Sequence, residues 1–472
     1  MLKIGITGHI HLDEYVLVLQ KMEEAIRDIL NKKDCSEFHA YSSLAQGSDR
    51  LFAQLAIDKF NAPLHVILPF EWDKYLKKFN DKAAEARSEY LYKKKSSLFI
   101  CCEGINVEND ADRKEAYLQS GLKMIDSVDV LIIVWNGKDS RGKGGTHDVL
   151  EEAKKRGKEI VIIPATTLIE EFKRPLSNDS RLEKKKYQNK WKLSIGLLIS
   201  GAICLGVSLG MCLESTPSYI LCGAEILFIG IGLILIKQIN NHDKKYKRIN
   251  SRLMAENLRN LRYMVQGGIQ LKPLLGKIDL SNLKDEEFKN IFTDIIKLEG
   301  KYTKRFPIIT NHVLAYERIE DLLESQRIFH EERAIEMGRE YNSEAKWIHH
   351  LKWIFILSLI IHAAYIIVGL THNNPHSELK SLLHHFGSVL SLTIPPIYAG
   401  FEAHKYLMEH EKFLGESLVY QEYFKREIER IQNKEIPVDG LVEYAHSLRK
   451  LLNLENNVWY KLMEYKEFHG IS

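Results

Sequence analysis

The sequence has few cysteines and little net charge. Its 472 residues include six cysteines, with no Cys-x-x-Cys pair and no regular spacing. This pattern argues against a disulfide framework and against a cysteine zinc site, so we expect reduced thiols that serve in packing. A formal net charge of +3 gives no reason to expect nucleic acid as a partner. The cysteines are Cys35, Cys101, Cys102, Cys204, Cys212 and Cys222.

The N-terminus lacks the features of a signal peptide. MLKIGITGHI has neither a basic region nor a long apolar core, and it predicts a short strand followed by a turn. We therefore expect the N-terminal part to fold in the cytosol.

Short β-branched runs alternate with amphipathic stretches over residues 1–165. Several runs are apolar throughout, which is typical of central parallel strands covered on both faces. With helices between them, the pattern predicts an α/β domain with a Rossmann-like parallel sheet. The predicted strands are 3–7, 38–43, 63–70, 128–135 and 159–164.

Two pairs of apolar segments follow. Segments 193–213 and 219–236 are each long enough to cross about 30 Å of hydrocarbon. The first contains Gly206 and Gly210, a spacing that lets helices approach closely. Basic stretches flank this hairpin on both sides, which predicts that both ends are cytoplasmic. The second pair is 353–370 and 386–401, and its last segment is short and carries two prolines.

The predicted architecture is therefore an α/β domain followed by a helical region with four transmembrane helices in two hairpins. Charged helices follow each hairpin, with aromatic and leucine positions at helical spacing. The predicted segments are an α/β domain (1–165), a basic linker (166–192), a first hairpin (193–236), a cytosolic helical region (237–350), a second hairpin (351–401) and C-terminal cytosolic helices (402–472).

Three glycine turns follow predicted strands and precede predicted helices. Glycine lets a backbone approach a ligand, and the free N–H groups of a helix N-terminus favour an anion. Parallel sheets bind ligands at the carboxyl ends of their strands, so the three turns predict one nucleotide-type site. Two acids in the first helical turns have two open interpretations: they complement the helix dipole, or one binds a ribose diol. The candidate ligand-binding residues are Gly8, His9, Ser43, Gly47, Ser48, Asp49, Gly144, Gly145, Thr146 and Asp148.

These turns carry a family resemblance. GITGH, SSLAQGSDRLFAQLA, LPFEWDKYLKKF and VLIIVWNGKDSRGKGGTHDVLEEAKKRG occur in the order and spacing of SLOG domains. This superfamily includes the Smf/DprA DNA-uptake protein and the Lonely Guy enzymes. The resemblance covers about the first 165 residues and implies a Rossmann-like fold. It also implies a nucleotide ligand, such as the cyclic ADP-ribose isomers or other NAD-derived nucleotides that the Thoeris effector binds.

The chain departs from the family at two places. Ile10 stands where close relatives often have arginine, which removes one phosphate contact. The Lonely Guy motif Pro-Gly-Gly-x-Gly-Thr-x-x-Glu is shortened here to Gly-Gly-Thr, and Asp148 stands near the acid position. Hydrolysis needs a well-placed acid or base, and only Asp148 and Glu151 are candidates. We therefore expect binding without turnover, no catalytic residue and no cofactor.

The apolar half resembles the two-span SLATT effector domains of bacterial conflict systems, chiefly in architecture and in the stretches AENLR (255–259) and 316–334. The two resemblances together imply a multi-pass protein of the bacterial inner membrane with both termini in the cytoplasm. A second messenger, made by a partner enzyme during phage infection, would switch a homo-oligomer to permeabilise the bilayer in abortive infection. A membrane-tethered nucleotide hydrolase and a metabolite-gated channel or transporter are the alternatives.

Ionisable residues in the apolar segments have competing interpretations. Glu225 lies inside the second segment and is a candidate for gating or pore lining, although it is close enough to the segment's end to reach the interface. We expect His362 to bond a neighbouring helix. The histidines of the loop in the second hairpin have no acid or cysteine at ligand spacing, so no metal is expected; they are His372, His376, His384 and His385.

Overall fold

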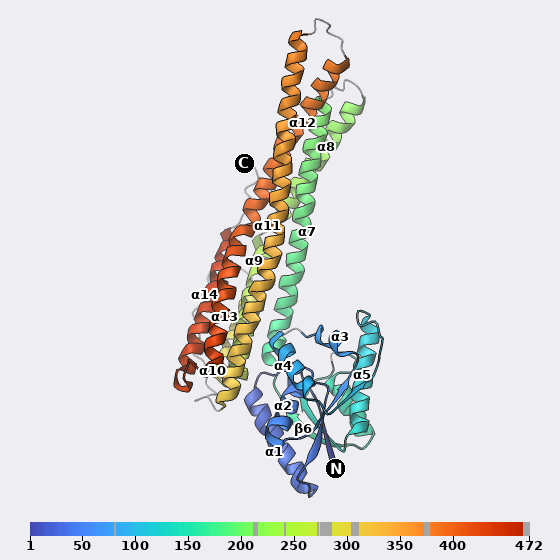
Figure 1. Cartoon of the computed structure of the whole chain (residues 1–472), viewed down its shortest axis with the longest axis vertical. Helices are drawn as coiled ribbons and strands as arrows, with labels where there is room; N and C mark the ends of the chain where they lie inside the picture. Colours follow the sequence, from blue (N-terminus) through green and yellow to red (C-terminus); the bar gives the residue numbers. More distant parts are fainter. Residues whose placement is uncertain are drawn as a thin grey trace. The chain divides into compact units, whose positions relative to one another are not determined.

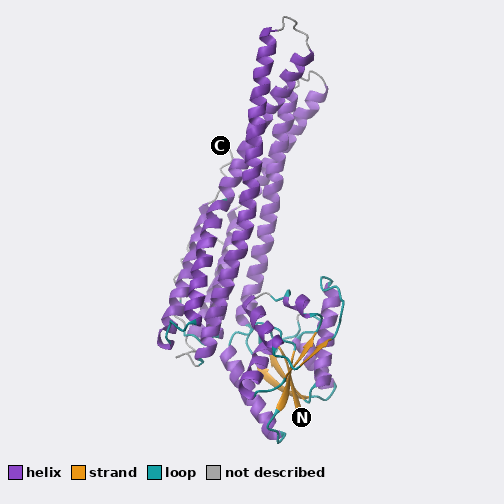
Figure 2. Cartoon of the chain, in the orientation of Figure 1, coloured by secondary structure: helices purple, strands orange, loops and turns teal. Residues whose placement is uncertain are grey.

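The computed structural model describes residues 1–79, 82–140, 142–210, 216–239, 242–270, 273, 286–303, 311–371 and 378–465. The chain forms two compact units. The first comprises Met1–Pro175, Met254–Ile328 and Tyr423–Glu455, and the second comprises Leu176–Leu253, Phe329–Glu422 and Asn456–Ser472. Among the described residues, the strands all lie in the N-terminal part of the chain, and the elements that follow it are helices (Figure 2).

The first unit contains a parallel sheet of six strands in the order β4-β3-β2-β1-β5-β6. The strands are β1 (Leu2–Gly8), β2 (Phe38–Ser42), β3 (Leu64–Leu68), β4 (Ser97–Ile100), β5 (Val130–Trp135) and β6 (Glu159–Pro164). The chain runs outward from β1 to β4 and then returns to place β5 beside β1. Gly8 pairs with Val134, so the carboxyl ends of β1 and β5 lie next to each other. This is the topological switch point at which open α/β sheets bind ligands.

The prediction of a Rossmann-like parallel sheet is confirmed, and one strand was missed. β4 is an edge strand of four residues, and Ser97, Leu98 and Phe99 are exposed. Such a strand has neither the long apolar run of a central strand nor a clear alternation.

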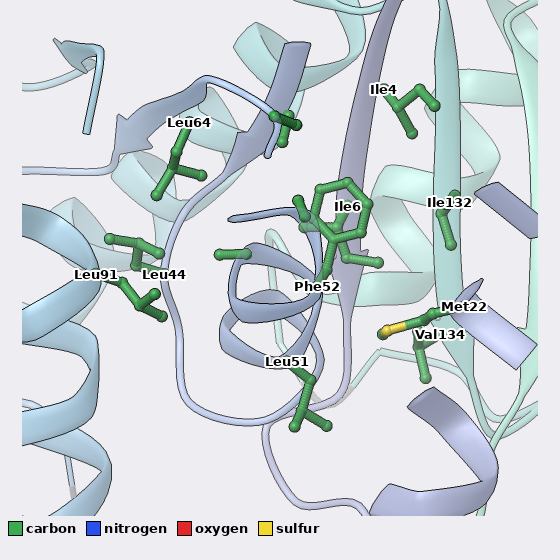
Figure 3. Close-up of a cluster of buried hydrophobic side chains, with 14 of the residues drawn as sticks. Ile4, Ile6, Met22, Leu44, Leu51, Phe52, Leu64, Leu91, Ile132 and Val134 are labelled. Atoms are coloured by element: carbon green, nitrogen blue, oxygen red, sulfur yellow. The ribbon is translucent and has the colours of Figure 1, made fainter. Parts of the chain in front are cut away.

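Helices cover both faces of the sheet (Figure 1). On one face, Ile4, Ile6 and Ile132 pack with residues of the flanking helices, among them Met22 and Phe52 (Figure 3). On the other face, a second cluster joins β5 to the helices α5 and α6. The helices of this domain are α1 (Tyr15–Lys32), α2 (Ser48–Phe60), α3 (Trp72–Leu76), α4 (Lys82–Lys93), α5 (Asp110–Ser127) and α6 (Thr146–Lys155).

The remaining described elements are long helices and a short 3-10 helix, η2 (Val438–Gly440), which confirms the predicted helical C-terminal region. The long helices are α7 (Leu168–Gly210), α8 (Thr216–Ile239), α9 (His242–Gln266), α10 (Glu286–Thr303), α11 (His312–Thr371), α12 (Glu378–Met408), α13 (His410–Gln432) and α14 (Leu441–Tyr465). Helix α7 starts in the first unit and continues into the second, with the boundary after Pro175.

Parts of the later helices belong to the same unit as the sheet. Arg87 of α4 bonds Asp321 of α11 at 2.8 Å, between Nε and Oδ1. Gln266, the last residue of α9, donates from Nε2 to the Leu12 carbonyl oxygen at 2.7 Å. Asp321 and Gln266 are buried, so these contacts are shielded from solvent. The turn after β1 is therefore packed against helical segments from much later in the chain.

In the second unit, small residues let helices pack closely. Ser194 of α7 donates from Oγ to the Gly232 carbonyl oxygen of α8 at 3.0 Å. A methyl group at Gly201 would lie 2.8 Å from Ile229 of α8. Gly206 packs against Thr393 of α12 so tightly that a methyl group there would overlap its side chain. The close approach predicted at Gly206 is confirmed.

The sequence predicts four membrane spans, whereas the described residues contain one helix that is long and apolar enough to cross a membrane. This helix is Leu168–Ser208, with a mean hydropathy of 1.6 over its most apolar 18 residues. A shorter apolar stretch, Gly223–Leu235, lies in α8. Two prolines fall inside α12, within the predicted fourth span. One such helix is weak support for membrane association, and the multi-pass arrangement stays a prediction.

Candidate functional site

A cavity of about 480 Å³ lies at the carboxyl ends of β1 and β5, and we call it the switch-point cavity. Its wall is formed by the turn after β1, the turn after β2, the loop between β5 and α6, and the start of α7. Tyr75, Phe79 and Tyr117 add an aromatic part to the wall. All these residues belong to the first unit. The three glycine turns therefore converge on one space, with aromatic rings on one part of the wall.

Most of the predicted site residues line this cavity. The lining ones are Gly8, His9, Ser43, Asp49, Gly144, Gly145 and Thr146. Gly47, Ser48 and Asp148 do not line it, and their contacts show that they support the turns instead. Ile10 also lines the cavity and is 47 % exposed.

Gly47 and Ser48 hold the second turn against the first. The Ser48 backbone N–H and hydroxyl both donate to the His9 carbonyl oxygen, each at 3.2 Å. Gly47 has φ +90°, and a side chain there would meet the backbone of His9 and Ile10. Only glycine fits such a position. These two residues therefore fix where His9 enters the cavity wall.

Asp148 holds the third turn closed. Its Oδ2 accepts a hydrogen bond of 2.9 Å from the Gly144 backbone N–H. Its own backbone N–H donates to Ser140 Oγ at 3.1 Å. Gly144 has φ +82°, and a methyl group there would lie 2.5 Å from the Leu118 backbone nitrogen. One Asp148 oxygen is therefore engaged in shaping the glycine turn that lines the cavity.

Asp49 is the buried acid of the wall, with 6 % of its surface exposed. Burial raises its pKa to about 7, against the opposing effects of hydrogen bonds from the Ser48 side chain and the Ser43 backbone. Burial also raises the pKa of Tyr75 well above its ordinary value, and the nearby Tyr117 and Asp49 charges add to this. Ligand-binding and catalytic sites are enriched in such perturbed groups. Near neutral pH this carboxyl changes charge, so it alters the electrostatics of the cavity.

Several cations of the wall are paired with acids that do not line the cavity. Lys78 bonds Glu108 at 2.6 Å, and Lys143 bonds Glu115 at 2.5 Å. Lys138 bonds Glu171 at 2.7 Å. The side chains of Lys138 and Lys143 are 61 % and 58 % exposed, whereas that of Lys78 is 25 % exposed. Solvent weakens the ion pairs of the two exposed lysines, so a ligand phosphate can compete for these two cations.

His147 is held beside the third turn by ring stacking. Its imidazole stacks on Trp135 with 5.6 Å between the ring centroids. Its Nδ1 lies 3.6 Å from Asp139 and its Nε2 lies 3.9 Å from Glu151. Glu151, the second candidate for hydrolytic chemistry, is exposed and bonds Lys154 at 2.8 Å. It does not line the cavity.

The start of α7 was missed as part of the site. Thr167, Glu170 and Arg174 line the cavity, although the sequence assigned them to a basic linker. Their turn is held by loops from both central strands. Asn136, after β5, donates from Nδ2 to Thr167 Oγ1 at 2.8 Å, and Asp13, after β1, accepts from the Leu168 backbone N–H at 2.7 Å. The charged turn before an apolar helix gave no sign that it folds back onto the sheet.

The other candidate residues are placed as follows. Glu225 lies in α8 with its side chain partly exposed. The side chains of Cys222, His362 and His384, and residues Cys212, His372 and His376, lie outside the described part. Four cysteines in the described part are free thiols: Cys35, Cys101, Cys102 and Cys204. Within the described ranges, no group of three or more histidine, cysteine or acidic side chains is placed to hold a metal ion.

No protein-family model matches the chain, and no curated protein matches its sequence. The SLOG resemblance therefore depends on the motifs quoted above, and the SLATT resemblance depends chiefly on the arrangement of the apolar segments.

Proposed function

We propose that this chain is a membrane effector whose SLOG-like domain senses a nucleotide-derived second messenger. One observation supports this above the others: the wall of the switch-point cavity includes the first two turns of α7, and α7 contains the candidate membrane span. A ligand in this cavity touches the helix that carries the membrane segment. The cavity, three glycine turns and two helix N-termini are suited to an anionic nucleotide.

The contacts of the acids favour binding over turnover. Asp148 accepts from the backbone of its own turn, and Glu151 is exposed and paired with Lys154. Asp49 is buried beneath the second turn. A hydrolase needs an acid or base within hydrogen-bond reach of the scissile bond. We therefore assign the cavity to recognition of an intact ligand of the cyclic ADP-ribose type or a related nucleotide.

The membrane half supplies the output in this proposal. Ligand binding favours an assembled homo-oligomer. In this oligomer each copy contributes four spans, arranged as two hairpins, and these spans permeabilise the bacterial inner membrane. Four spans with one or two polar groups are too few to enclose a pore, so several copies are needed. The messenger comes from a partner enzyme active during phage infection, and the result is abortive infection. To act as a switch, the ligand must bind the active state more tightly by several kcal/mol.

Liposomes that contain the full chain and a self-quenched dye test this proposal. Cyclic ADP-ribose isomers, ADP-ribose, NAD and cyclic oligonucleotides are added, and both dye release and ligand integrity are followed. We expect release with one ligand, which stays intact. Gly145→Glu should abolish release, because a side chain there meets Ser140 at 2.6 Å in the cavity wall.

Gly157→Glu is the control for the added charge, since it places the same charge at a surface turn with no heavy atom within 4 Å. Its φ of +62° makes the substitution cost about 1–2 kcal/mol of stability, away from the cavity. It should respond like the wild type. Consumption of a ligand without dye release would contradict the proposal and favour the membrane-tethered hydrolase. Solute transport that depends on the ligand, without loss of the dye, would favour a metabolite-gated channel or transporter.

A further inference from the structure

Among the residues that the structure describes, three carboxylates line the switch-point cavity, and one of them belongs to α7. They are Asp49, Asp139 and Glu170. Asp139 has a side chain that is 94 % exposed, so solvent screens its charge. Glu170 is only 8 % exposed. A buried acid opposes the binding of an anion in the same cavity, which raises the question of what Glu170 does there.

Glu170 contacts one imidazole and two guanidinium groups. Its Oε1 lies 3.7 Å from His11 Nε2 and 3.6 Å from Arg174 Nε, and its Oε2 lies 3.3 Å from Arg262 Nη1. His11 and Arg174 line the cavity themselves. The Glu170 carboxylate therefore lies between two groups that a ligand anion would contact. The distances to these two are longer than a direct hydrogen bond, so they are the contacts that exchange most readily.

This arrangement differs from that of the lysines in the wall. Lys78, Lys138 and Lys143 are paired with acids that do not line the cavity. Among the described residues of the wall, Glu170 is the buried acid that is paired with cations of the same wall. Glu170 also belongs to α7, the helix that contains the candidate membrane span.

We infer that Glu170 is a built-in competitor of the ligand: its carboxylate occupies, in the unliganded protein, the position that the ligand's anionic group takes beside His11 and Arg174. This inference rests on the proposed function and adds to it the regulation of the same site. Binding breaks the contact of Glu170 with His11, which ties α7 to the turn after β1, and the contact of Glu170 with Arg174 within α7, and it leaves the contact with Arg262. The ligand is thus detected through the loss of an inhibitory contact.

The first turn of α7 is placed to respond. Besides Glu170, it is tied to the cavity loops through Thr167, which accepts from Asn136, and through Glu171, which pairs with Lys138. Asn136 and Lys138 also line the cavity. An anion that draws His11 and Lys138 toward itself therefore weakens two ties of the same helical turn, through Glu170 and Glu171. The required ligand is one with a pyrophosphate or similar charge, since a neutral nucleoside cannot replace the carboxylate.

Binding of ADP-ribose and of inorganic pyrophosphate to the full chain in lipid nanodiscs tests the inference. The variants are Glu170→Gln and, as a control with the same charge change on the same helix, Glu183→Gln. Glu183 pairs with Lys186 on the surface and does not line the cavity. We expect Glu170→Gln to bind the probes about tenfold more tightly than the wild type, within the roughly 5- to 150-fold range of typical coupling. Glu183→Gln should stay within about twofold of the wild type.

Hydrogen exchange of segment 167–175 gives a second readout. In the wild type the exchange should increase on addition of ADP-ribose, and in Glu170→Gln it should be increased without it. Equal probe affinities for wild type and Glu170→Gln, with binding lost in Gly145→Glu, would overturn the inference and leave the proposed function standing. If neither probe bound wild type or Glu170→Gln at millimolar concentration, the proposed function would be overturned, and the inference with it.

Discussion

Asp13 and Leu168 are joined by a hydrogen bond of 2.7 Å, from the Leu168 backbone N–H to Asp13 Oδ2. The turn after the first strand thus satisfies the first free N–H of α7, the helix that contains the candidate membrane span. The Tyr302 hydroxyl donates to the same oxygen at 2.9 Å. One carboxylate therefore connects the sheet, α7 and α10 within the first unit.

The charge of Asp13 should make the stability of the protein depend on pH. Burial raises its pKa from 3.8 to about 6, although hydrogen bonds from Tyr302, Ile169 and Leu168 oppose the rise. Between these values the folded chain holds a proton that the unfolded chain has lost. The free energy of unfolding should therefore fall as pH rises from about 4 to 6, by about 3 kcal/mol. The unfolding midpoint, measured from pH 4 to 7, checks this.

Two variants separate the charge of Asp13 from its hydrogen bonds. Asp13→Asn keeps an acceptor for Leu168 but does not titrate, so its pH dependence should be flatter than that of the wild type. Asp13→Ala should also lose the helix cap, at a cost of about 0.5–2 kcal/mol at any pH. Asp49, whose pKa is also raised, contributes equally to all three proteins. If the unfolding midpoints of the wild type and Asp13→Asn changed in parallel with pH, the prediction would be contradicted.

Much of the fold could be predicted from the sequence because its signals are local. Five strands are visible as apolar β-branched runs, and the long helices are visible from composition. The edge strand β4 was missed because Ser97, Leu98 and Phe99 are exposed and lack the apolar pattern of central strands. The number of spans was predicted from hydropathy alone, and the described residues contain one qualifying helix.

The part of the site formed by glycine turns could be predicted from the sequence, because glycine is the residue that adopts a positive φ without strain. Glycines after strands indicated the cavity, since its wall needs positions such as Gly144, with φ +82°. The roles of Glu170 and Arg174 could not be predicted, because they depend on α7 folding back onto the switch point. Asp148 was placed in the right turn, but sequence does not show that its oxygen accepts from Gly144. The roles of Glu170, Arg174 and Asp148 depend on tertiary contacts, which the sequence pattern does not show.

Ligand affinity should depend on pH through Asp49, which lines the cavity and has a pKa of about 7. At pH 6 its carboxyl is mostly neutral, and at pH 8 it is charged and repels an anionic ligand. The wild-type dissociation constant for ADP-ribose should therefore rise by about threefold to tenfold from pH 6 to 8. The pyrophosphate of ADP-ribose keeps its charge over this range. Isothermal titration at both values measures the effect.

Asp49→Asn provides the control for this pH effect. Histidines also line the cavity, and the Asn variant retains them while its residue 49 stays neutral. Its affinity should change less between pH 6 and 8 than that of the wild type. An identical change in both proteins would assign the dependence to other groups.

Alanine at three glycines of the loop between β5 and α6 should have graded effects. Gly144→Ala places a methyl group against the Leu118 backbone at positive φ, so we expect a loss of about 1–3 kcal/mol in stability and at least tenfold in ADP-ribose affinity. Gly137→Ala has positive φ but open space, and should cost about 1–2 kcal/mol with little effect on affinity. Gly142→Ala meets only Lys114 at 3.5 Å and should be nearly neutral. Denaturant unfolding and titration calorimetry give both quantities. Equal effects at Gly144 and Gly142 would show that the close approach to Leu118 is unimportant.

Asp148 should act on affinity through the shape of its turn and not through chemistry. Asp148→Ala removes the acceptor of the Gly144 N–H, which costs about 0.5–1.5 kcal/mol and should weaken ADP-ribose binding several-fold. Asp148→Asn keeps an acceptor oxygen at the same position, so its affinity should stay within about twofold of the wild type. Titration calorimetry measures binding, and chromatography of the recovered ligand shows whether it is intact. In a hydrolase that uses Asp148 as its acid or base, the Asn variant would lose turnover while keeping its affinity. If the wild type consumes the ligand and Asp148→Asn does not, Asp148 is a catalytic residue. The protein would then be an enzyme and not a sensor.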